Sequence, residues 1–142
     1  MGVPGAATVV LAACDALALP FPAESFDVAM VAFGIRNFKD RTQGLREMLR
    51  VLKPGGRCLI LELTTPKTPV VAQLYSVYSQ AILPRIGEVV SRHNLAYSYL
   101  PTSISEFPEN AAFLSLMRDA GFRNTSAASL SFGVATIYIG TK

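Results

Sequence analysis

The chain has 142 residues, of which 51% are hydrophobic, and its formal net charge is +3. This length suits one domain with a hydrophobic core, and the lysines and arginines are too scattered to indicate nucleic-acid binding. No apolar run reaches the roughly 18 residues of a membrane-spanning helix, and the amino terminus lacks the basic region of a signal peptide. Cys14, Cys58 and His93 lack the spacing of zinc ligands, so we expect no metal site and a reducing, cytoplasmic setting.

The first part of the chain predicts two strands joined by a loop. Residues Val9–Leu11 form a short β-branched run that ends near Cys14, and the two prolines in Leu19–Asp27 indicate a loop. Phe26–Gly34 is an apolar run of strand length, a pattern typical of a strand covered on both faces. Because Cys14 and Cys58 both lie in apolar runs, we expect both thiols to be buried.

A helix and a third strand follow. Leucine and methionine residues recur at helical spacing over Asp40–Leu52, with Asp40 or Thr42 as the N-cap. Lys53–Gly56 has the proline and glycine of a type II turn, and Arg57–Leu63 is again a strand. A strand–helix–strand unit with one tight link indicates a parallel sheet.

The second half predicts two helices and a hairpin. Apolar and aromatic residues have helical spacing over residues 71–82, and Asn110–Phe122 is a second amphipathic helix with Gly121 at its C-cap. Two strands flank Ser131–Gly133. The expected fold class is therefore α/β, a mostly parallel sheet with helices on its faces and an antiparallel hairpin at the C-terminal edge.

Ligands in such sheets bind beyond the carboxyl ends of the strands. In this chain those ends are Asp15-Ala16, Phe33–Asn37 and Glu62–Thr65, and each of them carries polar side chains. We therefore expect the functional residues to lie at these three places.

Several segments resemble the ubiquinone/menaquinone biosynthesis C-methyltransferase family, over residues 8–142. The LKPGG turn is shared by many class I methyltransferases, whereas FGIRN followed by RVLKPGGRCLILELT is much more specific, although Thr64 replaces the family's usual serine. The resemblance implies one incomplete, Rossmann-like class I methyltransferase domain over residues 1–142. Within it, residues 66–108 would form a substrate-side insert of helix and loop. It also implies methyl transfer from S-adenosylmethionine to the ring of a polyprenyl quinol.

The resemblance assigns the cofactor to two places. Asp15 and Ala16 match the family position that contacts adenine, where a carboxylate can accept from the exocyclic amine. The alternative for Asp15 is a turn residue that binds its own backbone. Ala32 and Phe33 fall at a second cofactor position, although Ala32 lacks the hydroxyl of some family members.

The methyl acceptor would lie beyond the next strand ends, at Arg36, Asn37 and Glu62. Arg36 stays protonated, so we expect it to stabilise a developing phenolate or to orient a water, and Asn37 could hold a ring oxygen. Glu62 could orient the guanidinium of Arg36 or contact the acceptor. The alternatives are a surface pair of Arg36 with Asp40 or Glu24, and a purely structural Glu62.

The insert carries four tyrosines that the resemblance places near the quinol: Tyr75, Tyr78, Tyr97 and Tyr99. An aromatic stripe at helical spacing also suits a hydrophobic core, and both interpretations stay open. A polyprenyl substrate implies contact with a membrane surface.

The sequence contains no glycine-rich turn of the Gly-x-Gly-x-Gly type and no following acidic strand end, because Val9–Leu11 matches the family's third strand. We therefore expect an incomplete domain with weak or no cofactor binding on its own. We also expect a homo-oligomer that covers the unpaired sheet edge. A methyltransferase with another acceptor and a non-catalytic scaffold remain alternative functions.

Overall fold

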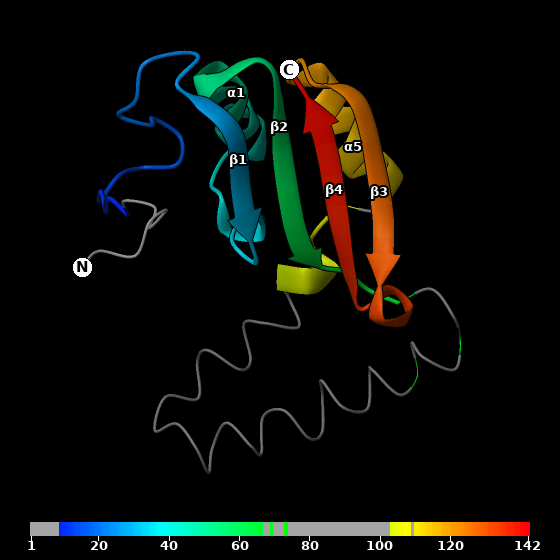
Figure 1. The fold of residues 1–142 in the computed structure, drawn as a ribbon. Coiled ribbons are helices and arrows are strands. Elements are labelled where there is room, and N and C mark those ends of the chain that lie inside the picture. The colour runs from blue at the N-terminus through cyan, green and yellow to red at the C-terminus, as the bar shows by residue number, and fades with distance from the viewer. Residues whose placement is uncertain (1–8, 67–68, 70–72, 74–102, 109) are drawn as a thin grey trace, which may run out of the picture.

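A computed structural model describes residues 9–66, 69, 73, 103–108 and 110–142. Its centre is a four-stranded sheet in the order β1-β2-β4-β3 (Figure 1). The strands are β1 (Phe26–Ala32), β2 (Leu52–Leu63), β3 (Arg123–Leu130) and β4 (Ala135–Thr141). β1 and β2 are parallel, whereas β4 is antiparallel to both of its neighbours. The expected α/β fold with a C-terminal hairpin is confirmed, but the described sheet is mixed and not mostly parallel, because β4 pairs antiparallel with both β2 and β3.

Two helices lie on one face of this sheet (Figure 1): α1 (Arg41–Val51) and α5 (Asn110–Asp119). Between helices and sheet lies a core whose fully buried side chains include Leu45, Cys58, Ile60, Phe113 and Tyr138. Burial raises the pKa of the Cys58 thiol to about 12. No helix in the described part of the chain is long and apolar enough to cross a membrane.

One terminus of each helix has the cap that the sequence predicts, namely the start of α1 and the end of α5. The Asp40 side chain accepts a hydrogen bond of 2.9 Å from the Gln43 amide and so caps α1. At the end of α5, Gly121 adopts a φ of +110° while the Phe122 amide donates to the Met117 carbonyl, a Schellman ending. Of the predicted helix over residues 71–82, only residue 73, which is helical, is among the described residues.

The opposite face of the sheet is uncovered among the described residues, so the prediction that β1 is covered on both faces is wrong. Met30 is 75% exposed and Val28 45%, because both point away from the two helices. Ala29 and Val31 alternate with them and pack against the core. The apolar run of β1 therefore has one buried and one open side.

The amino-terminal segment also differs from the prediction. Residues 9–14 form no strand, and the side chains of Val9, Val10 and Leu11 are more than four-fifths exposed. Cys14 is exposed as well, in contrast to the buried thiol that we expected. The physical reason is that a strand needs a neighbour, and no described strand lies beside this segment to accept its backbone hydrogen bonds.

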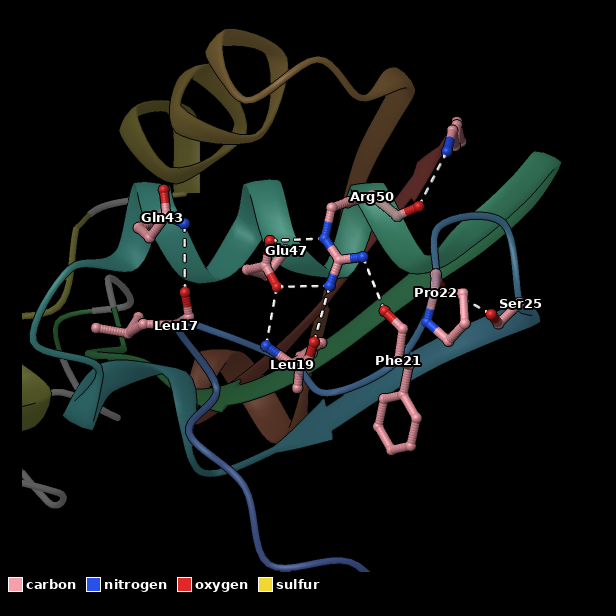
Figure 2. Close-up of polar contacts among 9 residues, drawn as sticks. Leu17, Leu19, Phe21, Pro22, Ser25, Gln43, Glu47 and Arg50 are labelled. Carbon is pink, nitrogen blue, oxygen red and sulfur yellow. Dashed lines mark hydrogen bonds and ion pairs between the residues drawn. The ribbon is translucent and has the colours of Figure 1, made fainter.

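A two-residue clamp on α1 fixes the loop before β1 (Figure 2). Arg50 and Glu47 form a bidentate pair with two N···O distances of 2.8 Å. Arg50 also donates to the carbonyls of Leu19 and Phe21, at 2.9 and 2.8 Å, and Glu47 accepts from the Leu19 amide at 2.8 Å. Side chains of one helix thus replace the strand partners that this loop lacks.

Gly121→Ala should lower the free energy of unfolding by about 1–2 kcal/mol, because alanine is strained at positive φ. The added Cβ would also lie 2.8 Å from Cδ2 of Leu49. Gly55→Ala is the control, since Gly55 has a φ of +79° and no atom lies within 4 Å of the place that its new methyl group would take. Urea unfolding should show the larger loss for Gly121→Ala, and equal losses would contradict a contribution from the Leu49 contact.

Glu47→Ala should release the loop, with amide exchange at Leu19 faster by roughly tenfold or more. The matched control is Glu24→Ala, which removes only a 3.7 Å contact with Lys142. The hydrogen bond from Arg50 lowers the pKa of Glu47. Protection of Leu19 should therefore persist at neutral pH and disappear only as the pH falls through that lowered pKa. Unchanged exchange in Glu47→Ala would refute the clamp.

Candidate functional site

The carboxyl end of β2 carries a fully buried carboxylate, Glu62. The Arg36 guanidinium donates to Glu62 Oε1 through Nη1 at 2.7 Å, and the Arg36 backbone amide donates to Oε2 at 3.2 Å. The Leu63 amide also donates to Oε1, at 2.9 Å. Three N–H groups therefore compensate the buried charge, and the pair joins the end of β2 to the short helix η1 (Ile35–Asn37) that follows β1.

This contact decides between the alternatives for Arg36. Its carboxylate partner is Glu62, whereas Asp40 caps α1 and Glu24 lies beside Lys142 at 3.7 Å. The guanidinium does not make the bidentate contact that Arg–carboxylate pairs often show, because one carboxylate oxygen takes the backbone amide instead.

The rest of Arg36 is held by its own neighbours. Nη1 also donates to the Phe33 carbonyl, and the Arg36 carbonyl accepts from Nη2 of Arg41 at 2.9 Å. Nε is buried and has no partner among the described residues. Asn37 ends the same short helix and is exposed. Its backbone amide donates to the Gly34 carbonyl at 3.0 Å. The Arg36 guanidinium is therefore fixed in position and retains donor capacity.

Asp15 begins a local turn. Its Oδ1 accepts from the Leu17 amide at 2.9 Å, and its carbonyl accepts from the Ala18 amide at 3.1 Å. The turn alternative thus accounts for one carboxylate oxygen, and the second oxygen of this exposed side chain can still accept from a ligand. No hydrogen bond between described residues joins Asp15 to the Arg36–Glu62 pair.

The second predicted cofactor position lies at the end of β1. Ala32 is exposed, and Phe33 is 44% exposed with a φ of +55°, a conformation uncommon for a bulky residue. The Phe33 amide donates to the Leu61 carbonyl at 2.8 Å, which ties this turn to β2. The backbone here is therefore held in a strained conformation directly before Arg36.

Beyond Glu62, a further polar group that sequence reasoning missed joins β2 to the hairpin. Thr64 Oγ1 donates to the Gly133 carbonyl at 2.9 Å and lies 3.0 Å from Thr136 Oγ1. Tyr138 donates its hydroxyl proton to Asn110 Oδ1 at 2.7 Å. The sequence indicates only the Thr64 hydroxyl, since its partners lie 69 and 72 residues further along the chain.

The Tyr138 hydroxyl keeps its proton at neutral pH. Burial, reinforced by the negative charge of Glu62, raises the pKa of the Tyr138 phenol to about 12. The described residues contain no group of three or more side chains that could hold a metal ion. The predicted pocket residues Tyr75, Tyr78, Tyr97 and Tyr99 lie outside the described residues. The described site thus consists of the Arg36 cation, the Glu62 carboxylate that pairs with it, and neutral hydroxyl and amide groups.

Comparison with solved structures identifies the fold. A SAM-dependent methyltransferase from Thermotoga maritima superposes with a TM-score of 0.63 at 22% identity, over 91% of this chain and 62% of that one. A SAM-dependent methyltransferase from Aquifex aeolicus gives 0.61 at 14% identity, over 93% and 54%. The sheet is therefore of the class I methyltransferase type.

Comparison with curated proteins gives much higher identities. The ubiquinone/menaquinone biosynthesis C-methyltransferase UbiE of Geobacter sulfurreducens is 50% identical over 138 residues, which are 97% of this chain and 53% of that protein. The demethylmenaquinone methyltransferase of Deinococcus radiodurans is 48% identical over 128 residues, or 90% and 53%. The chain thus spans about half the length of these relatives. A model of the ubiE/COQ5 methyltransferase family matches residues 3–142, and the chain belongs to that family.

Proposed function

We propose that this chain carries the acceptor side of a methyltransferase that transfers a methyl group from S-adenosylmethionine to the ring of a polyprenyl quinol. The observation that supports it most is the buried Arg36–Glu62 pair at the carboxyl edge of the sheet. That pair connects FGIRN and the strand after KPGG, the segments most specific to the family. The names of the relatives, quinone-pathway C-methyltransferases, supply the substrate class.

The residues present fit the adenine end of the cofactor. Asp15 offers a second carboxylate oxygen to the exocyclic amine, and the backbone of Ala16 lies beside it in a loop that the Glu47–Arg50 pair holds in place. Ala32 and Phe33 would contact the cofactor at the end of β1. When bound, S-adenosylmethionine supplies an electrophilic methyl group on a sulfonium.

Arg36 would act on the acceptor through charge. Methylation at a ring carbon is easier when the ring hydroxyl is ionised, and a fixed guanidinium stabilises the phenolate that develops. Arg36 remains protonated, so it is not the base. Glu62 would orient the guanidinium, and Asn37 would hold a ring oxygen. Much of the remaining acceleration would come from alignment of the reacting groups. The tyrosines of the insert over residues 66–108 stay predicted pocket residues.

Arg36→Lys should lower kcat/KM for quinol methylation by about 100-fold, since the ammonium cannot keep both the Glu62 contact and the phenolate. Glu62→Gln should lower kcat/KM by a smaller factor and leave the Arg36 side chain less firmly held. Methylation with a radiolabelled methyl donor measures the rate, and calorimetry measures cofactor affinity, which should stay unchanged in both variants. Full activity in Arg36→Lys would overturn its role, and no binding at millimolar S-adenosylmethionine would overturn the function for this chain.

We also infer that a second copy of the chain covers the edge of β1 that has no partner among the described strands, because an unpaired edge beside exposed apolar side chains favours strand pairing. Light scattering after size exclusion should give a dimer or higher assembly, and Met30→Lys should shift it toward monomer. A folded monomer of the unaltered chain would contradict this. The polyprenyl tail of the proposed substrate implies that the protein acts at a membrane surface.

A further inference from the structure

A cavity of about 640 Å³ lies at the carboxyl edge of the sheet, and none of the predicted site residues that the structure describes lines it. Among the described residues, three parts of the chain line it: the end of β2 with Thr64 and Thr65, residues 104–108 together with Asn110, and the β3–β4 turn with Phe132. Its volume is within the range of about 300–1,000 Å³ that small-molecule sites occupy.

The cavity adjoins the Arg36–Glu62 pair. Glu62 and Thr64 are alternate residues at the end of β2, so their side chains leave the same face of the sheet. Arg41, which donates to the Arg36 carbonyl, places its guanidinium 5.7 Å from the centre of the Phe107 ring. Phe107 of the cavity wall is therefore connected to Arg36 through Arg41.

The sheet order sets the positions along this edge. The Asp15 loop lies against α1 on the β1 side, the Arg36–Glu62 pair joins β1 to β2, and the cavity lies between β2 and the β3–β4 turn. The cation thus separates the predicted adenine contact from the cavity. A methyl acceptor must approach the reacting centre from a side that the donor does not occupy, and the cavity provides that side.

The cavity wall carries polar groups among apolar side chains. Tyr138 gives its proton to Asn110 Oδ1, so Asn110 offers a ligand its amide nitrogen, a donor with two hydrogens. Thr64 gives its proton to the Gly133 carbonyl, and its oxygen then accepts from Thr136 Oγ1 at 3.0 Å. Phe107 and Ile104 supply apolar contact beside them. Polar groups within an aromatic and aliphatic wall suit a hydroxylated ring.

The rim is apolar and strained. Ser131, Phe132 and Gly133 follow one another with positive φ values of 49°, 58° and 92°. This turn leaves the Phe132 side chain 86% exposed, and Leu130 beside it is 43% exposed. The exposed Phe132 side chain, beside a cavity that carries polar groups, suits a ligand whose ring is polar and whose substituent is apolar.

We propose that this cavity binds the hydroxylated ring of the quinol acceptor, with its isoprenoid tail leaving over Phe132. The inference rests on the proposed function and deepens it, because it places the acceptor against named residues. Asn110 donates to a ring oxygen and Phe107 contacts the ring, while the tail lies on the apolar rim.

Two probes separate ring from tail: 1,4-naphthalenediol, kept reduced without oxygen, and the same diol with one five-carbon isoprenyl group. NMR titration of the labelled chain should shift the signals of Thr64, Asn110 and Gly133, and the isoprenyl probe should bind about tenfold more tightly. Thr65→Trp fills the cavity from an exposed position and should weaken both probes at least roughly tenfold. Ser126→Trp, on an exposed part of β3 outside the cavity, is the matched control.

Two further variants keep the test decisive if Thr65→Trp misfolds. Asn110→Asp keeps the oxygen that accepts from Tyr138 but lacks the amide donor, so it should weaken the bare ring about tenfold, and Phe132→Ser should remove only the gain from the isoprenyl group. Shifts outside the cavity, or equal affinities in all variants, would overturn the proposal even where quinol methylation is observed. Conversely, cavity binding without S-adenosylmethionine binding would refute the proposed function and leave the site intact.

Discussion

The arrangement of the site depends on one constraint, the burial of the Glu62 carboxylate at the end of the central strand β2. A buried charge is costly unless it is paired, and three N–H groups, two of them from Arg36, meet that requirement. Because Arg36 binds through both backbone and side chain, the turn after β1 has one position relative to β2. The same interaction that makes the buried charge tolerable therefore fixes a cation at the ligand edge.

The sheet order then sets the positions of the proposed binding places relative to this contact. β2 is paired on both sides, in parallel by β1 and antiparallel by β4, so the ends of β1 and β2 and the β3–β4 turn meet at one edge. Thr64 ties the end of β2 to that turn through the Gly133 carbonyl. A donor held near Asp15 and an acceptor held near Thr64 would thus approach the same guanidinium from opposite sides.

Local patterns predicted the parts of the fold that local physics decides. The N-cap Asp40, the positive φ of Gly55 and the Schellman ending at Gly121 are such features, and all are present. Hydrophobicity alone does not distinguish a strand with two covered faces from one with an open face, so β1 is predicted correctly as a strand and wrongly as covered on both faces. The same kind of pattern predicts a strand over Val9–Leu11 and a buried Cys14, and the structure shows neither. The Thr64–Thr136 contact and the cavity depend on residues distant in the sequence, and no single-chain pattern indicates such pairing.

The groups that hold the described site together lie on one side of the sheet. The core, the clamp of Arg50 and Glu47, and the Arg36–Glu62 pair all lie on or beside the helix-covered face of the sheet. The exposed apolar side chains of Val28 and Met30 lie on the other face. Under the proposed function, Arg36 and Glu62 would act on the acceptor, and both are already held in place by their own contacts. Donor binding needs a backbone cradle close to the cofactor, and Asp15 with Ala16 would contribute only its adenine end. The described residues therefore supply more of the proposed acceptor site than of the proposed donor site.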